Sequence, residues 1–375
     1  MSKEKSMTDE CNKIIVGIIF FIFNSAIYAQ DILWKEIRIP MSEAGPNGLE
    51  AILVEPNIPG KHPLALISHG SPRDADMRAD MTALSFLPIA TEFARRGFVS
   101  AVVLRRGYGS SDGNWVEGYG TCKAANYKQA ALISAQDLHA AINYLDKLPQ
   151  VDADQMIAVG VSAGGFATIG LTADSPPKGL VAAIGFAPGR GSTARDTVCQ
   201  EEALVSSFGF LGKTSRIPML WVYAENDHFF NPSLAREFLK EFNENGGNAT
   251  LNVAPAFKDD GHTLFSTTGI PEWTPLVDGF LKTQHIVLLN EKLPLPERAS
   301  LQPPSQMASK SRDEFLKYLA SPPHKAFAID AKGAFGWRSG RHTIDEAKDK
   351  ALAACKQFSA TGCKLYAIEN EYAGQ

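Results

Sequence analysis

The sequence predicts an α/β protein with a mostly parallel sheet flanked by helices, followed by a small C-terminal α+β module. From about residue 31 to 285, short apolar runs alternate with segments of helical spacing, which is typical of strand–helix–strand crossovers. Several runs are apolar throughout, as expected for strands that are buried on both faces. A Pro-rich segment without periodicity then separates this region from the end of the chain.

The first two strands are expected to be antiparallel. Residues 32–39 and 49–54 alternate between apolar and polar side chains, and a Gly/Pro/Asn-containing turn lies between them. This pattern predicts a hairpin at the start of the sheet.

The following elements alternate in type. The expected strands, which are continuously apolar or nearly so, are 64–67, 98–104, 156–159, 180–186, 218–223 and 250–253. The expected helices are 84–96, 124–148, a helix that begins directly after Ser162, 232–245 and 273–283. Gly97 ends the first of these helices, and the second stops before Pro149. Residues 189–214 form a Gly-rich insertion between a strand and the next one.

Residues 286–310 are predicted to be a linker, and residues 311–375 a separate small module. Within the module we expect a short helix over 312–320, a hairpin of 326–329 with 334–337, and a strand over 364–368. Thr343 and Glu346 have the spacing of a capping box, which predicts a helix from there to about Phe358. So small a unit has little core and benefits from a covalent crosslink.

The N-terminus has the pattern of a signal peptide over residues 1–29. Lysines precede the apolar run 14–23, which is shorter than a membrane-spanning helix, and small Ala29 is the expected last residue before cleavage. An uncleaved N-terminal anchor is the alternative. Both interpretations place the rest of the chain outside the cytoplasm, secreted or periplasmic, and the mature chain has no expected membrane span.

Four cysteines lie beyond the predicted signal peptide, and an even number in an exported chain predicts two disulfides. Proximity favours a pair between Cys355 and Cys363, which leaves Cys122 to pair with Cys199. Free buried thiols are the alternative for the second pair.

Charge and composition exclude some classes of function. The formal net charge is −4, with 37 Lys and Arg against 41 Asp and Glu, and no basic cluster predicts binding to nucleic acid. The histidines lack close ligand spacing, so we expect no metal and no cofactor. The sequence leaves the oligomeric state open.

The strongest functional motif is Gly160-Val161-Ser162-Ala163-Gly164, which follows the buried strand at 156–159. A serine hydroxyl attacks a carbonyl only when it is held in an exposed position beside a base. A sharp strand-to-helix turn supplies that position, and glycines on both sides of the serine let the turn close. The motif therefore marks Ser162 as a candidate nucleophile.

Two further residues complete a candidate catalytic triad. Asp227 follows the strand at 218–223, and His262 lies in a loop after the last strand. Carboxyl ends of parallel strands meet at one edge of a sheet, so all three side chains are expected to converge. The order Ser, acid, His is the one found with this motif. Glu225 is the alternative acid.

Two backbone N–H groups are expected to bind the oxyanion that forms on the attacked carbonyl. One is the N–H of Ala163, and the other comes from the loop 68–72, with Ser71 preferred over Gly70. His69 is expected to position this loop.

Aromatic side chains near these loops are candidates for the substrate pocket. Trp115, Tyr119 and Tyr127 follow the strand at 98–104, whereas Phe208 and Phe210 lie in the insertion 189–214. They either wall the pocket or simply pack the segments that carry them.

Together, His69-Gly70-Ser71, the motif around Ser162, Asp227 and Gly261-His262 resemble the α/β-hydrolase superfamily. Over about residues 31–285 the chain is most similar to exported dienelactone hydrolase-like and prolyl-oligopeptidase-like proteins. The segment 105–113 resembles the Gly-rich turn that those proteins carry after the fourth strand. The resemblance implies an eight-stranded sheet in a catalytic domain, residues 30–285, and an esterase- or peptidase-type reaction.

One departure from the family limits what the resemblance implies. Dienelactone hydrolases use a cysteine nucleophile, whereas this chain has Ser162, so their substrate is not carried over. We predict a serine hydrolase that cleaves small carboxylic esters through an acyl-enzyme on Ser162. The alternatives are a serine peptidase of prolyl-oligopeptidase type acting on short peptides, for which no propeller-like repeat is visible, and a non-catalytic binding protein on a hydrolase fold.

Overall fold

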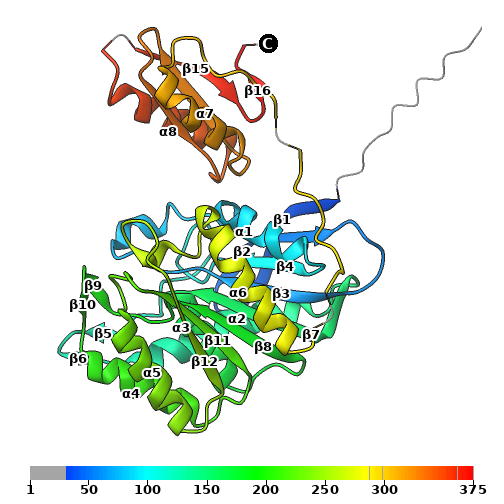
Figure 1. The fold of residues 1–375 in the computed structure, drawn as a ribbon, viewed down its shortest axis with the longest axis vertical. Helices are drawn as coiled ribbons and strands as arrows, with labels where there is room; N and C mark the ends of the chain where they lie inside the picture. The colour runs from blue at the N-terminus through cyan, green and yellow to red at the C-terminus, as the bar shows by residue number, and fades with distance from the viewer. Residues whose placement is uncertain (1–30, 287, 298, 361, 375) are drawn as a thin grey trace, which may run out of the picture. The chain divides into compact units, whose positions relative to one another are not determined.

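The computed structural model describes residues 31–286, 288–297, 299–360 and 362–374; the predicted signal peptide, 1–29, lies outside them. Its centre is an eight-stranded sheet in the order β1-β2-β4-β3-β7-β8-β11-β12 (Figure 1). The strands are β1 (Ile32–Met41), β2 (Gly45–Pro56), β3 (His62–Ser68), β4 (Val99–Val103), β7 (Val151–Val161), β8 (Leu180–Phe186), β11 (Met219–Ala224) and β12 (Ala249–Ala254). The β1–β2 and β2–β4 pairs are antiparallel, and the other pairs are parallel.

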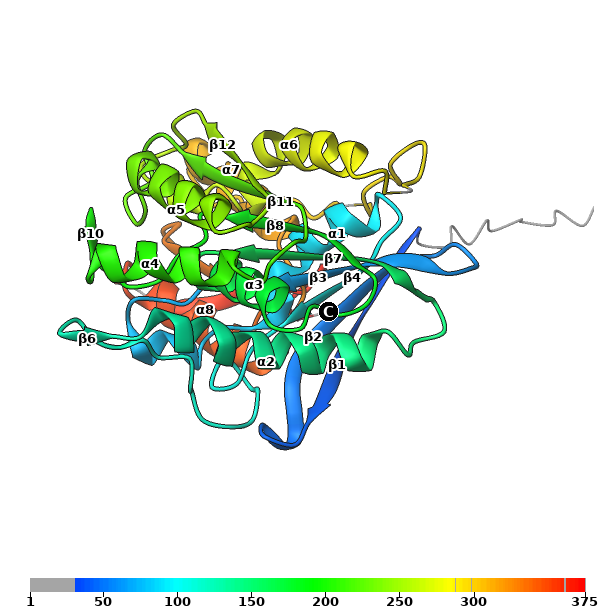
Figure 2. The same cartoon turned by 90° about the horizontal axis from the view of Figure 1, so that it is seen from below.

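Helices cover both faces of this sheet. They are α1 (Leu87–Ala94), α2 (Tyr127–Leu145), α3 (Ala163–Ala173), α4 (Glu201–Gly212), α5 (Pro232–Glu244) and α6 (Ile270–Thr283). Figure 2 shows α6 and α2 on opposite sides of the strands. Among the residues that the structure describes, no helix is both long enough and apolar enough to cross a membrane.

The two faces explain why the central strands are apolar throughout. Successive side chains of a strand point to opposite faces, so both sets must be apolar when helices cover both sides. In β3, Ala65 and Ile67 belong to the cluster that packs against α1 and α6, whereas Leu64 and Leu66 belong to the cluster that packs against α2 and α3. The predicted α/β fold class is therefore confirmed, and all eight expected strands are present.

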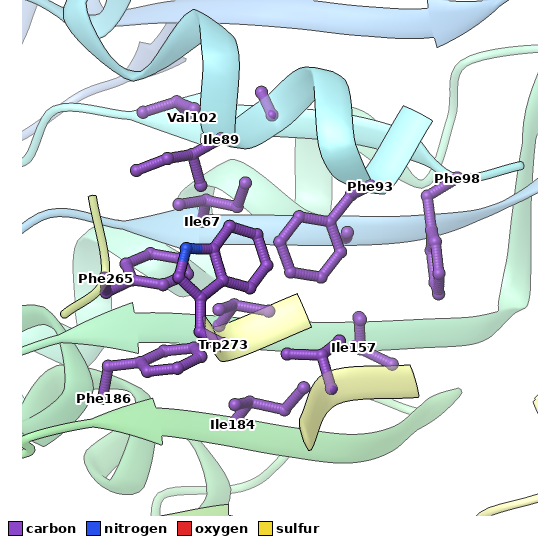
Figure 3. Packing of buried hydrophobic residues seen from close by; sticks show 14 of the residues in the cluster. Ile67, Ile89, Phe93, Phe98, Val102, Ile157, Ile184, Phe186, Phe265 and Trp273 are labelled. Carbon is purple, nitrogen blue, oxygen red and sulfur yellow. The ribbon is translucent and has the colours of Figure 1, made fainter. Parts of the chain in front are cut away.

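Trp273 of α6 is the centre of the first cluster. Its side chain is fully buried, and its ring contacts those of Phe93, Phe186 and Phe265 at centroid distances of 5.1–6.0 Å (Figure 3). Phe265 belongs to the loop that carries His262, so this packing attaches a candidate site loop to the core.

The segments that contain α2 and α4 differ from their predicted structure. The helix expected from residue 124 begins at Tyr127, because the strands β5 (Gly120–Thr121) and β6 (Ala124–Ala125) form a short hairpin and the Asn126 side chain caps the helix. The insertion 189–214 is mostly regular, with β9 (Ser192–Ala194) paired to β10 (Thr197–Val198) and with helix α4 after them. Helix α4 was not predicted because the segment is rich in glycine. Its buried face includes Leu204 and Leu211.

The end of the chain forms a four-stranded antiparallel sheet with two helices, here called the C-terminal module. Its strands have the order β14-β13-β15-β16. The elements are α7 (Arg312–Leu319), β13 (Ala326–Asp330), β14 (Phe335–Arg338), α8 (Ile344–Lys356), β15 (Cys363–Ile368) and β16 (Glu371–Tyr372) (Figure 1). Five short 3-10 helices complete the described elements: Ala75–Arg78, Ala83–Phe86, Gly261–Thr263, Thr267–Gly269 and Ser309–Ser311.

The start of α8 uses half of the predicted capping box. The Thr343 hydroxyl accepts a hydrogen bond from the Glu346 N–H at 3.1 Å, as expected. The Glu346 carboxylate, however, accepts from the N–H of His342 rather than from that of Thr343, at 3.0 Å. The helix ends at Lys356, slightly before the expected position.

The structure contains both of the predicted cysteine pairs. Cys122 is bonded to Cys199 and Cys355 to Cys363, with Cα–Cα distances of 5.2 and 6.1 Å. The first bond joins the β5–β6 hairpin to the segment between β10 and α4, and the second joins α8 to β15.

Replacing Trp273 with Ala is expected to lower the free energy of unfolding by about 3–5 kcal/mol, because it empties the centre of a packed cluster. Chemical denaturation followed by circular dichroism measures the change. Trp34→Ala is the matched control, since Trp34 is 37% exposed on β1, and it should cost less than about 1 kcal/mol. Equal losses in the two variants would contradict the packing described here.

Candidate active site

Ser162 occupies the turn between β7 and α3 with a strained backbone. Its φ of 55° and ψ of −121° are rarely adopted by a residue with a Cβ. The conformation is held from both sides: the Ser162 N–H donates to the Phe186 carbonyl at 2.8 Å, and the Gly189 N–H donates to the Ser162 carbonyl at 3.2 Å. Such a turn lifts the serine above the edge of the sheet, as a nucleophile requires.

The glycines that flank Ser162 are required by close backbone contacts. A Cβ on Gly160 would lie 2.3 Å from the Gly164 carbonyl oxygen. A Cβ on Gly164 would lie 2.3 Å from the carbonyl oxygens of both Ser68 and His69. Helix α3 can therefore approach β7 and the loop after β3 only because these side chains are absent.

Asp227 and His262 meet at the carboxyl ends of β11 and β12. The His262 Nδ1 lies 3.1 Å from Asp227 Oδ2 and 3.2 Å from Oδ1. The Asp227 side chain is fully buried, and its Oδ1 accepts hydrogen bonds from the N–H groups of Phe229 and Phe230 at 2.8 and 2.9 Å. A buried, fixed carboxylate at Nδ1 keeps one tautomer of the imidazole and leaves Nε2 available to a nucleophile.

Two further contacts orient His262. Its ring stacks on the ring of Phe229 with a centroid distance of 3.8 Å and an interplanar angle of 7°. Asp260 caps the 3-10 turn Gly261–Thr263, and its Oδ1 accepts from the N–H of His262 at 3.0 Å. Asp260 is thus a turn residue, and it fixes the loop that carries the imidazole.

Of the two acids left open by the sequence, Asp227 is the one that contacts the imidazole. Glu225, the alternative, is exposed at the end of β11. Ser162 and His262 line the same cavity, whose volume is about 780 Å³. The structure thus pairs His262 with Asp227 and places His262 and Ser162 on one cavity.

The loop after β3 passes close to Ser162, as expected for an oxyanion site. A Cβ on Gly70 would lie 3.3 Å from the Cβ of Ser162, and Ser71 lines the same cavity as Ser162. Ala163 is the first residue of α3, where backbone N–H groups have no partner within the helix. Backbone of both segments therefore lies next to Ser162.

His69 has a positioning role in this loop. It is fully buried; its Nδ1 lies 2.6 Å from the Gly70 carbonyl oxygen, and its Nε2 accepts from the Arg105 N–H at 3.0 Å. Burial, together with the nearby Arg105 guanidinium, lowers the pKa of His69 to about 3. The ring is therefore neutral and tethers two loops, which agrees with the role expected from the sequence.

Sequence reasoning missed Glu117, a buried carboxylate on which three segments around Ser162 converge. Arg105 donates to both of its oxygens at 2.5 and 3.1 Å, and Arg190 donates to one of them at 2.7 Å. The hydroxyls of Tyr108 and Ser134 donate to it as well. Burial alone would raise the pKa of Glu117, but the two guanidinium groups hold it well below its usual value of 4.5.

Arg105 and Tyr108, which both bind the Glu117 carboxylate, also form hydrogen bonds to the loop after β3. Arg105 also donates to the Ser68 hydroxyl at 2.7 Å and to the His69 carbonyl at 2.8 Å. The Tyr108 hydroxyl lies 2.8 Å from Ser71 Oγ. The sequence did contain one signal of a buried carboxylate, namely Arg105 and Arg106 shortly after β4. A charge at the end of a buried strand needs a buried partner.

Ser162 also lines a second cavity, of about 350 Å³. Its lining includes two of the predicted pocket residues, Trp115 and Tyr119. Its other lining residues are Ser71, Pro72, Arg73, Arg78, Gly118, Gly120, Ala163, Gly189, Arg190, Gly191, Ser192, Phe229 and Phe230.

The other three predicted pocket residues do not line either cavity. Phe208 is fully buried and packs between the rings of Phe166 and Phe238, so its assignment to the pocket is wrong. Phe210 is 38% exposed on α4. Tyr127 is buried beneath Tyr119, and its hydroxyl donates to the Cys199 carbonyl. The prediction failed for Phe208 because residues 189–214 were expected to be irregular. Without the helix α4, the sequence did not show on which side of the segment each phenylalanine lies.

No group of three or more His, Cys, Asp or Glu side chains suited to a metal ion occurs in the described part of the chain.

A mostly parallel eight-stranded sheet, with a serine in a strained strand-to-helix turn and an Asp–His pair at the same edge, defines an α/β-hydrolase. The family model for the dienelactone hydrolase family matches residues 83–271, just over half of the sequence. The chain belongs to the dienelactone hydrolase family and is a hydrolase. No curated protein matches it by sequence.

Solved structures with similar folds include several esterases. An esterase from Pyrococcus furiosus is 15% identical, with a TM-score of 0.48, covering 67% of this chain and 93% of that one. Esterase 2 from Thermogutta terrifontis, phosphoramylated by tabun, is also 15% identical with a TM-score of 0.48, covering 68% and 96%. A putative dienelactone hydrolase from Klebsiella pneumoniae is 14% identical with a TM-score of 0.46, covering 67% and 99%.

Replacing Glu117 with Gln is expected to lower the free energy of unfolding at pH 7 by about 3–5 kcal/mol, because two buried guanidinium groups lose their counter-charge. Since the folded-state pKa of Glu117 is depressed, its contribution is complete above the unfolded value of 4.5 and is lost as the pH falls through the folded pKa. Urea denaturation of both proteins between pH 7 and pH 3 measures the difference.

Glu202→Gln is the matched control, since Glu202 is exposed on α4. It should change stability by less than about 0.5 kcal/mol. A Glu117 variant as stable as this control at pH 7 would show that the carboxylate does not organise the loops.

Proposed function

We propose that this chain is an exported serine hydrolase that cleaves carboxylic esters through an acyl-enzyme on Ser162. One observation carries the proposal: His262, with Nδ1 held 3.1 Å from the buried Asp227 carboxylate, lines the same cavity as Ser162. A fixed imidazole with an acid behind it is the base that a serine hydroxyl needs.

In the acylation step, His262 Nε2 takes the proton of the Ser162 hydroxyl as Oγ attacks the ester carbonyl carbon. The C=O double bond opens, and its electron pair forms an oxyanion in a tetrahedral intermediate. The intermediate then collapses, the bond to the alcohol oxygen breaks, and His262 returns the proton to that oxygen. Asp227 stabilises the imidazolium that exists between these two transfers.

Deacylation repeats the sequence with water. His262 removes a proton from a water molecule, whose oxygen attacks the acyl carbon on Ser162. The second tetrahedral intermediate releases the acid, and the proton returns to Ser162 Oγ. The enzyme regains its starting state with one water consumed.

Backbone N–H groups are assigned to the oxyanion. The N–H of Ala163 is one donor, and the N–H of Ser71, with Gly70 next, is the other. The close approach of Gly70 to Ser162 and the tethering of its loop by His69 support this assignment. Donors that are fixed before the reaction stabilise the developing charge without reorganisation.

Two other functions remain to be separated from this one. A serine peptidase would use the same residues on amide bonds, with protonation of the leaving nitrogen by His262. A non-catalytic binding protein would keep the fold but not the reaction, and the Asp227–His262 pair argues against it.

Export is supported by the cysteine pairs, because disulfides form and persist outside the cytoplasm. The same compartment was expected from the pattern of residues 1–29.

A fluorophosphonate probe is expected to label the wild-type protein and to leave Ser162→Ala unlabelled, because the probe reacts with an activated serine. Gel fluorescence measures the labelling. Ser207→Ala is a useful comparison, since that serine is buried on α4 and donates to the Leu204 carbonyl, and it should still be labelled.

Equal labelling of wild type and Ser162→Ala would remove Ser162 from the mechanism. A panel of p-nitrophenyl esters of increasing acyl length, assayed beside aminoacyl p-nitroanilides, separates esterase from peptidase. Turnover of the anilides without turnover of the esters would reverse the ranking of these two activities.

Asp227→Asn is expected to lower kcat for the preferred ester by about three to four orders of magnitude, because the imidazole loses its tautomer and its counter-charge. Glu225→Gln is the matched control, since Glu225 is an exposed acid two residues away, and its kcat should stay within about twofold of wild type. Steady-state kinetics of both variants measure the difference. If kcat fell only in the Glu225 variant, Glu225 rather than Asp227 would be the acid that supports His262.

A further inference from the structure

The C-terminal module contacts the loops that surround the candidate active site. The Thr82 hydroxyl donates to the Gly340 carbonyl, and Lys350 Nζ lies 2.7 Å from Asp80 Oδ1. His342 Nε2 lies 3.3 Å from the carboxylate of Glu50, which also accepts from the N–H groups of Ala83 and Ser110. These contacts place the loop after β14 and the helix α8 against the segment 80–86.

This contact makes the module a wall of the cavity that holds Ser162 and His262. Ser162, His262, Gly70, Ser71 and Val161 line the cavity from the main sheet and its loops. The module lines it with Arg338, Arg341, Lys350, Ala353, Ala354 and Gln357. A substrate bound at Ser162 in this cavity therefore faces side chains of the C-terminal module.

The charges on this wall are unbalanced. Arg338 donates to the Trp337 carbonyl, and Arg341 donates to the carbonyls of Ser339 and Asp80. Neither guanidinium has a carboxylate within 4 Å in the described residues, whereas Lys350 is paired with both Asp80 and Glu346.

A third arginine reaches the cavity from the main sheet's loops. Arg73 lies over the ring of Phe229 at 3.5 Å and donates to Ser192 Oγ and to the Ala194 carbonyl. It too lacks a carboxylate partner within the described part of the chain. Asp80 is the one acidic side chain among the lining residues of this cavity; it is ion-paired with Lys350 and also interacts electrostatically with Arg341.

Three guanidinium groups that have no carboxylate within 4 Å among the described residues line one cavity, although the net charge of the chain is −4. Guanidinium groups bind carboxylates through paired, charge-assisted hydrogen bonds. Arg338 and Arg341 lie outside residues 83–271, the segment that the family model matches.

We propose that the C-terminal module forms part of the substrate pocket and that Arg338 and Arg341, with Arg73, select esters that carry a carboxylate group. The proposal rests on the proposed function, because it names the class of ester that reaches Ser162. The carboxylate can belong to the acyl part or to the alcohol part of the ester, and the two cases need different substrates in the test.

The experiment uses the full chain and two matched substrate pairs. For the acyl side, the mono-p-nitrophenyl ester of adipic acid is compared with p-nitrophenyl hexanoate, which has the same chain length without the carboxylate. For the alcohol side, 4-carboxyphenyl butyrate is compared with 4-carbamoylphenyl butyrate. The readout is the ratio of kcat/KM for the charged ester to kcat/KM for the neutral ester.

Arg338→Gln is expected to lower this ratio about tenfold in one of the two pairs, as the loss of one charge-assisted hydrogen bond predicts. Arg341→Gln should lower it in the same pair. Lys364→Gln removes an equal charge from an exposed position on β15 that does not line the cavity, and it should leave the ratio unchanged. The exposed position of Arg338 keeps its variant folded, which a thermal unfolding curve checks.

A ratio that stays within twofold of wild type in both pairs for Arg338→Gln would overturn the proposal, as would an equal drop in Lys364→Gln. Failure of the proposed function has a different signature, namely no turnover of any of the four esters. In that case, calorimetric titration of adipate into Ser162→Ala still decides the inference. The inference is supported if adipate binds Ser162→Ala and binds about tenfold more weakly to the double variant Ser162→Ala/Arg338→Gln. It is refuted if adipate does not bind Ser162→Ala.

Discussion

The buried carboxylate of Glu117 is the interaction on which the arrangement of the site depends. It accepts hydrogen bonds from Arg105 and Arg190, which belong to two different loops, and Arg105 continues to the Ser68 hydroxyl and the His69 carbonyl. A charged group in so dry a position is tolerated only when every partner is in place. The network therefore allows the loops after β3, β4 and β8 essentially one relative position, and Ser162 stands among them.

That rigidity explains how a strained residue persists. The left-handed backbone of Ser162 is unfavourable by itself, yet hydrogen bonds to Phe186 and Gly189 and the close contact of Gly164 with the β3 loop hold it. On the opposite side, Asp260 and Phe229 hold the imidazole that faces the same cavity. The proposed reaction would therefore rely on groups that are in place before substrate binds, rather than on groups that must move.

Much of this could be predicted from the sequence, because the signals were local. Continuous apolar runs located the buried strands, and Gly-Val-Ser-Ala-Gly marked the turn at Ser162. Glu117, in contrast, lies in a loop with no periodicity, and only the fold shows that Arg105 and Arg190 need it. Phe208 was misassigned because α4 was not recognised within a Gly-rich segment. The contribution of Arg338 and Arg341 to the cavity was also invisible, since it arises from contacts between segments more than two hundred residues apart.

The central claim is that the Ser162 hydroxyl becomes acylated during turnover. The most direct test is to mix the enzyme with p-nitrophenyl butyrate, to quench it in acid within the first turnover, and to analyse its proteolytic peptides by mass spectrometry. We expect one butyryl group on the peptide that contains Ser162, and we expect it to be lost when the mixture is left to turn over before quenching. Release of p-nitrophenol with the butyryl group on another residue, or on none under conditions that preserve oxygen esters, would contradict it.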